Sequence, residues 1–265
     1  MSSEEVTLPQ TWPVSISCGE LKIHIWHHTI SGYVGQIDCW TYLSEGMRKV
    51  NQPELVITLR RRPSEPEHEY SLEPLEWFKM VYLWGQEGRI IDAYHTHEGQ
   101  SEHWLGSKNL EVITHGMPIP IPGFGPGFFP PHRFHGIALT REEANIAKVF
   151  GYTRVIGHYG ISQRWFPYCP WIDRDRDDCI SMAQMENSMR SREFPCKTIR
   201  GLSARWEGDY IILTIPLGKE QEVKAVVKQT SPEEAWAFDS SLHPNADSCP
   251  YWQAGQSQMS VFSAW

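Results

Sequence analysis

The stretch Ile37–Leu59 constrains the fold of this 265-residue chain more than any other part of the sequence. Its first half carries apolar residues at the i, i+3 and i+7 spacing of one helix face: Trp40, Leu43 and Met47. Asp38 is suited to cap such a helix, and Pro53 to end it. The run Leu55–Leu59 then predicts a strand, because it is rich in β-forming residues. A helix joined tightly to a strand favours an α+β fold.

The remaining segments extend this pattern. Strands are predicted at Leu21–Trp26, Phe134–Leu139, Thr153–Tyr159, Gly201–Trp206 and Tyr210–Ile215. Apolar and polar residues alternate in the first of these and in the last two, which are predicted to form a hairpin. Ser71 caps one further predicted helix, and Thr140 with Glu143 forms the capping box of another, which ends at Gly151. The prediction is an α+β fold, a single domain with a mixed or mainly antiparallel sheet and flanking helices. The domain is expected over residues 18–252, between an N-terminal arm at 1–17 and a tail at 253–265.

The segment Met117–Pro131 has too many prolines and glycines for the interior of a helix or strand. It also carries large apolar residues that need burial: Ile119, Ile121, Phe124, Phe128 and Phe129. We interpret it as an ordered crossover that covers the core. The alternative is an exposed aromatic binding loop.

Composition excludes several classes of function. A formal net charge of −8 argues against a general nucleic-acid binder, which needs a basic surface to displace phosphate counterions. The sequence has no apolar stretch of membrane-spanning length and no secretory signal, so a cytoplasmic protein without a membrane partner is expected. The six cysteines form no C-x-x-C pair and are expected to be reduced.

Two clusters resemble parts of metal sites. His95, His97, Glu98 and His103 offer zinc ligands, but their spacing is not H-E-x-x-H and no fourth ligand follows at a diagnostic distance. The run Asp173–Asp178 begins like a calcium loop but lacks its glycine and its final glutamate. We therefore expect no metal and no cofactor.

The acidic run is instead predicted to be an exposed docking surface with internal arginine pairing. The partner-binding candidates are Asp173, Asp175, Asp177 and Asp178, with Glu98 and Glu102 as second choices. The aromatic residues Phe124, Phe128 and Phe129 are the next candidates. No catalytic residue is predicted, although a nucleophile such as Cys169 near His158 stays open as an alternative.

Several short motifs occur in one order along the chain. They are Asp38–Tyr42 with Gly46, the strand ELVITL, Leu105–Lys108, Tyr168–Pro170 after a strand containing Gly160, Gly201-Leu202, Ile215-Pro216 and Ala246–Ser248. From about Tyr33 to Trp252, this order resembles the C-terminal domain of SARA and endofin, the FYVE-finger scaffold proteins, and more distantly the suppressor-of-fused domain. The resemblance implies an α+β protein-binding domain without catalytic residues. The chain lacks a cysteine-rich finger, so endosomal placement does not carry over. As a stand-alone domain it looks like bacterial suppressor-of-fused-like proteins, many of which are thought to be immunity proteins.

Two classes of function follow. The first is a non-enzymatic, cytosolic binder, most concretely an immunity protein that neutralises a cognate toxin, such as a type VI secreted one; a signalling scaffold is a variant of this class. Its partner would be a basic toxin or effector domain, in keeping with the acidic charge. The second class is a hydrolase-like enzyme that uses the His95–His103 region or Cys169.

Overall fold

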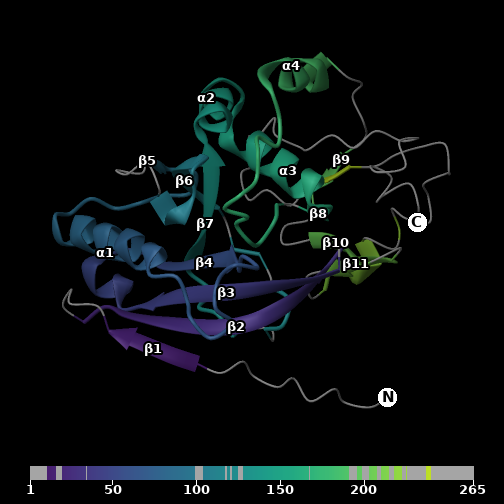
Figure 1. The fold of residues 1–265 in the computed structure, drawn as a ribbon. Coiled ribbons are helices and arrows are strands. Elements are labelled where there is room, and N and C mark those ends of the chain that lie inside the picture. The colour runs from purple at the N-terminus through teal and green to yellow at the C-terminus, as the bar shows by residue number, and fades with distance from the viewer. Residues whose placement is uncertain are drawn as a thin grey trace, which may run out of the picture. The chain divides into compact units, whose positions relative to one another are not determined.

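The computed structural model describes residues 11–15, 20–33, 35–98, 104–116, 118–119, 121–124, 128–166 and 168–190, with short stretches at 196–198, 203–207, 210–214, 218–222, 225 and 237–239. Its contacts divide the chain into two compact units. Unit 1 comprises Met1–Ser31, Gln36–Arg141 and Pro170–Asp177, and unit 2 comprises Gly32–Gly35, Glu142–Cys169 and Asp178–Trp265. Each unit is described separately below (Figure 1).

Unit 1 is built on a seven-stranded sheet of order β1-β2-β3-β4-β7-β6-β5. Its strands are β1 (Thr11–Ser15), β2 (Lys22–Gly32), β3 (Gly35–Glu45), β4 (Glu54–Arg60), β5 (Thr96–Glu98), β6 (Leu110–Gly116) and β7 (Arg133–Thr140). Strands β4 and β7 run parallel, whereas β1–β2, β3–β4, β5–β6 and β6–β7 are antiparallel pairs. The sheet is therefore mixed. Together with the helices of the chain it confirms the predicted α+β fold class.

The predicted helix over Asp38–Gln52 is wrong, because this segment forms β3 and only a short 3-10 helix, η1 (Met47–Val50). Strand β3 pairs with β4 in a register that sets Trp40 opposite Leu59 and Tyr42 opposite Ile57. Residues 39–44 are all buried, so both faces of this strand are covered. A strand buried on both faces loses the apolar–polar alternation by which strands are recognised.

One face of the sheet packs against α1 (Glu73–Gln86). The helix buries five large side chains there: Leu75, Trp77, Phe78, Val81 and Tyr82. They join residues of β2, β3 and β4 in one hydrophobic core. The helix was predicted, but the predicted cap Ser71 is wrong: the N-cap is Leu72, which makes no side-chain cap hydrogen bond. A second 3-10 helix, η2 (Trp104–Gly106), precedes β6.

The described part of the crossover covers core residues, as predicted. Ile119, Ile121 and Phe129 are buried, and Phe124 and Phe128 are half-buried. All three phenylalanine rings lie against Trp26 of β2, with ring centroids 5.9, 5.3 and 6.2 Å from it for Phe124, Phe128 and Phe129.

Unit 2 contains α2 (Arg141–Phe150, of which Arg141 belongs to unit 1), α3 (Tyr152–Ser162) and α4 (Met182–Arg190). Its strands are β8 (Trp165–Phe166), β9 (Cys196–Thr198), β10 (Ser203–Glu207), β11 (Tyr210–Thr214) and β12 (Ala237–Asp239). The predicted hairpin is confirmed, since β10 and β11 pair antiparallel. The predicted strand Thr153–Tyr159 is wrong: it lies in α3, where Val155, Ile156 and Tyr159 are buried at helical spacing.

Gly151 ends α2 as predicted, with a positive φ of 97° and its N–H donating to the carbonyl of Ala147.

The side chain of Glu143, in the first turn of α2, accepts a hydrogen bond from the backbone N–H of Cys179 at 2.7 Å. The predicted domain limits near residues 17 and 252 lie outside the described residues and stay predictions.

Candidate functional site

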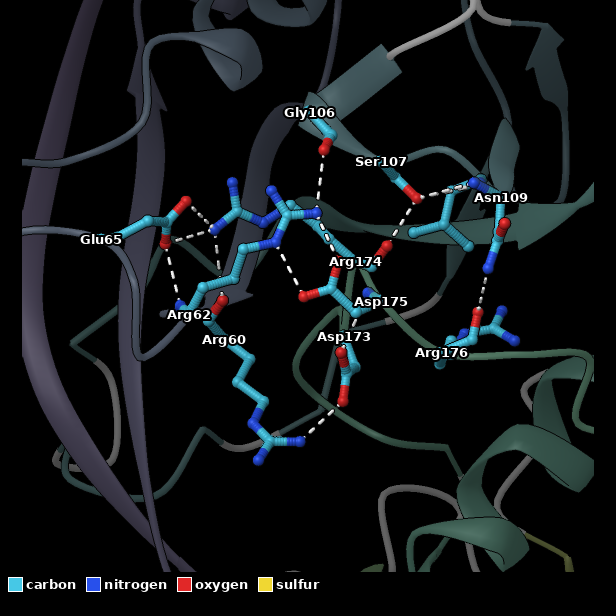
Figure 2. A network of polar contacts seen from close by, with 11 residues as sticks. Arg60, Arg62, Glu65, Gly106, Ser107, Asn109, Asp173, Arg174, Asp175 and Arg176 are labelled. Atoms are coloured by element: carbon cyan, nitrogen blue, oxygen red, sulfur yellow. Dashed lines mark hydrogen bonds and ion pairs between the residues drawn. The ribbon is translucent and has the colours of Figure 1, made fainter.

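The start of the predicted acidic run is held against the end of β4 by hydrogen bonds and ion pairs within unit 1 (Figure 2). Ile172 extends the pairing of β4: its N–H donates to Thr58 O at 2.7 Å, and its carbonyl accepts from Arg60 N at 2.9 Å. The Ser107 hydroxyl donates to the Arg174 carbonyl at 2.6 Å. These hydrogen bonds fix the backbone at the start of the run, at Ile172 and Arg174.

Arginines of the chain neutralise the first two aspartates of this run. Arg60 pairs with Asp173 at 2.6 Å, and Arg62 holds both carboxylate oxygens of Asp175, at 2.6 and 2.8 Å. The hydrogen bond from Arg62 lowers the pKa of Asp175, and the same bond raises the pKa of Arg62. The internal arginine pairing that the sequence predicted is therefore present.

Arg174 points the other way, into unit 1. Its side chain is 2% exposed, and its guanidinium lies 2.5 and 2.6 Å from the two carboxylate oxygens of Glu65. Figure 2 shows Arg62 beside this pair, and the backbone N–H of Arg62 donates to the Glu65 carboxylate at 2.9 Å. We call the residues Arg60, Arg62, Glu65, Asp173, Arg174 and Asp175 the arginine network.

The other predicted contact residues are spread over the chain. Asp177 and Asp178 are exposed; Asp177 belongs to unit 1 and Asp178 to unit 2. Glu98 pairs with Arg141 at 2.9 Å. Glu102 lies outside the described residues. The aromatic candidates Phe124, Phe128 and Phe129 pack on Trp26, as described above. The structure does not test the binding role of any of these residues, which stays a prediction.

Of the histidine cluster considered for zinc, His95 and Glu98 are exposed, whereas His97 is half-buried and packs against His115 in unit 1. The rings of His97 and His115 lie 4.8 Å apart, beside Trp84 and Trp77 respectively. Burial lowers the pKa of His97 to about 4 and that of His115 to about 3, so both are neutral near pH 7. Within the described ranges, no group of three or more His, Cys, Asp or Glu residues could hold a metal ion. His103 lies outside those ranges.

Cys169, the alternative nucleophile, is 2% exposed. The candidate base, His158 of α3, has its pKa lowered to about 4 by burial. A catalytic cysteine needs an accessible, electropositive environment, and Cys169 lacks the accessibility.

A feature that the sequence analysis missed lies beside the arginine network. A groove of about 500 Å³ runs between the loop after β4 and the first turn of α1. We call it the acidic groove and define it by Glu65, Glu69, Tyr70, Leu72, Glu73 and Glu76. Glu69 and Glu76 are exposed, and in the described part of the chain their side chains make no hydrogen bond or ion pair.

The sequence did carry a signal for this groove. Between Arg62 and Lys79 it contains five glutamates and neither lysine nor arginine. The composition of the segment does not show that these glutamates line one groove, because that depends on how the loop after β4 lies against α1.

Comparisons with known proteins find a weak likeness in fold and no relative by sequence. No family model matches the chain, and no curated protein matches it. Among solved structures, one described as the Sufu–Fu complex is 14% identical with a TM-score of 0.43, over 64% of this chain and 82% of that chain. Drosophila Suppressor of Fused is 14% identical with a TM-score of 0.44, over 88% of this chain and 62% of its own length. This is the distant suppressor-of-fused likeness that the sequence indicated, and it is too weak to carry an argument about function. The resemblance to SARA and endofin stays a prediction.

In the part of the chain that the structure describes, no helix combines the length and the apolar character needed to cross a bilayer.

Proposed function

We propose that this chain is a non-enzymatic protein-binding domain with a basic partner. One observation carries the proposal. The arginines beside the end of β4 form ion pairs with carboxylates of this chain, while neighbouring glutamates face solvent. Arg60, Arg62 and Arg174 each hold a carboxylate of the same chain. Glu69 and Glu76, on the adjacent loop and helix, are exposed. The surface here is therefore acidic, in keeping with the net charge of −8.

An acidic surface of this kind steers a basic partner into contact and fixes its orientation more than it adds to raw affinity. Within the predicted acidic run, Asp173 and Asp175 have a structural task in the arginine network. We therefore propose the exposed Asp177 as the contact residue of that run.

The most specific form of the proposal is a cytosolic immunity protein that blocks a toxin by direct binding. Toxins that act on nucleic acid are commonly basic, because they bind phosphate. This step rests on the resemblance of the stand-alone domain to suppressor-of-fused-like immunity proteins, and so on analogy. The hydrolase alternative has no comparable observation in its favour, since Cys169 is buried and His97 and His115 are packed against tryptophans.

The test is to express the chain together with the protein encoded by the neighbouring gene. We expect a basic neighbour to co-purify with the chain and its toxicity to be suppressed. Affinity, measured by calorimetry at several salt concentrations, should fall as salt screens the charges. A neighbour that is not bound at low salt, or binding that salt leaves unchanged, would contradict the proposal.

A further inference from the structure

We propose that the acidic groove is the docking site for a basic segment of the partner, one in which an apolar residue lies among lysines or arginines. This inference rests on the proposed function and assigns it a place. All residues that line the groove belong to unit 1.

The groove is preformed, because both of its walls are anchored. On the loop side, Glu65 is held by the buried guanidinium of Arg174. At the start of α1, the Tyr42 hydroxyl donates to the Ser71 carbonyl at 2.9 Å. Pro74, which lies in the first turn of α1 and is buried, limits backbone freedom there. A site fixed before binding loses less conformational entropy when its ligand arrives.

The charge of the groove selects a cation. Of its four carboxylates, Glu65 is matched by Arg174, which leaves Glu69, Glu73 and Glu76. A helix N-terminus carries roughly half a positive charge, and three carboxylates outweigh it several-fold. Lysine or arginine is therefore favoured, and an anionic ligand is repelled.

The apolar part of the groove adds a second requirement. Leu72 is 64% exposed, the largest exposure among the large apolar side chains of helix α1 and its flanks. The half-buried ring of Tyr70 also lines the groove. An apolar side chain of the ligand would cover Leu72, and each buried methylene group contributes to affinity. Charge and apolar surface together fit a basic segment with an apolar anchor.

The test uses two fluorescent synthetic peptides of equal charge and the full chain. One peptide has lysine pairs separated by single leucines, and the other has glycine in place of each leucine. The groove variant carries Glu69→Lys and Glu76→Lys. The matched control carries Glu67→Lys and Glu142→Lys, which change the net charge equally at exposed positions that do not line the groove.

We expect the groove variant to bind the leucine peptide about tenfold more weakly than the parent, and the control to stay within about twofold, at low salt. The parent should prefer the leucine peptide over the glycine peptide, and Leu72→Ser should abolish that preference. Circular dichroism of each variant verifies folding, and Glu69→Gln with Glu76→Gln repeats the test without charge reversal.

Equal weakening in the groove variant and the control would mean general charge attraction, and would overturn the inference. So would a parent that binds neither peptide at low salt. The proposed function is tested separately with the neighbouring gene product. If that protein binds the parent and the groove variant equally well, the groove is not the docking site, while the proposed function stands.

Discussion

At the scale of single residues, Gln52 holds α1 to the chain that follows it. Gln52 is 2% exposed, and its side-chain amide donates to Val81 O at 3.2 Å and to Arg89 O at 2.6 Å. Its carbonyl accepts from Ile91 N at 3.0 Å. Gln52→Leu keeps the volume but leaves three backbone groups without this partner. We expect a loss of about 2–4 kcal/mol of unfolding free energy, measured with urea.

The matched control for Gln52 is Gln86→Leu, at an exposed position near the end of the same helix. It should change stability by less than about 0.5 kcal/mol. A loss below about 1 kcal/mol for Gln52→Leu would show that water replaces these hydrogen bonds.

Two of the three ion pairs in the arginine network should differ in energy, the buried pair of Arg174 and the more exposed pair of Asp175. The Arg174 side chain is 2% exposed, whereas that of Asp175 is 63% exposed. Breaking a buried pair by removing one partner leaves the other charge poorly solvated, whereas an exposed pair is screened by water. We expect Arg174→Met to lose about 2–4 kcal/mol and Asp175→Asn less than about 1 kcal/mol in denaturant unfolding. Equal losses would contradict this assignment of burial.

At the scale of elements, the packing of α1 on β7 depends on the absence of a side chain at Gly136. A Cβ atom there would lie 2.9 Å from the Trp77 ring, and Trp77 is 0% exposed. In an ordinary strand, Gly→Ala stabilises by roughly 0.5–1 kcal/mol. Here we expect Gly136→Ala to destabilise by about 1–3 kcal/mol, because the core cannot yield.

A double-mutant cycle tests this packing explanation. The combination of Gly136→Ala with Trp77→Phe should lose less stability than the sum of the two single changes, since the smaller ring admits the methyl group. Additive losses would place the cause elsewhere.

The same scale shows what the sequence could predict. Strands β2, β4 and β7 were found because their apolar residues follow strand patterns, and α1 because its buried residues recur at helical spacing. The sequence of β3 does not distinguish a strand from a helix because, with both faces buried, its apolar residues also fit helical spacing. Helix α3 was taken for a strand because the run Thr153–Tyr159 contains β-branched residues, and tertiary packing overrides that weak preference.

Part of the candidate site could be predicted from the sequence, and part could not. The arginine network joins residues 113 positions apart, such as Arg62 and Asp175. Internal pairing of the acidic run could be expected from its own composition, but its partners Arg60 and Arg62, at and just after the end of β4, could not be named before the fold was known. The acidic groove lies within a few turns of chain, so the run of glutamates between Arg62 and Lys79 was visible from the start.

At the scale of the whole molecule, the chain passes repeatedly between the two units, after Ser31, Gly35, Arg141, Cys169 and Asp177. A single cut therefore cannot separate them. Strands β4 and β7, which lie before and after the crossover, pair through Leu55 and Phe134. We predict that cleavage at a specific protease site placed after Gly123 gives two fragments that elute together in gel filtration and separate only in denaturant. Separation under native conditions would mean that the β4–β7 pairing does not hold the halves together.

The stability of unit 1 should also fall in mild acid, because it buries several neutral histidines. Burial lowers the pKa of His28 to about 4, of His97 to about 4 and of His115 to about 3, and it lowers that of His135 well below its ordinary value. In the unfolded chain these groups titrate near 6.5. Between about pH 4 and 6.5 the unfolded state therefore binds more protons than the folded state, so stability is complete above pH 6.5 and is lost as the pH falls.

Each such histidine contributes a slope of up to about 1.4 kcal/mol per pH unit within that window. We expect the unfolding free energy, measured with urea from pH 7 down to pH 4.5, to decline steeply for the parent. His115→Gln should decline less steeply, by about 1 kcal/mol per pH unit, even if it is less stable at pH 7. His68→Gln, at an exposed position on the loop after β4, should keep the slope of the parent. A parent and a His115→Gln variant with equal slopes would show that His115 is protonated in the folded protein, and that its place between Trp77 and His97 can accommodate the charge.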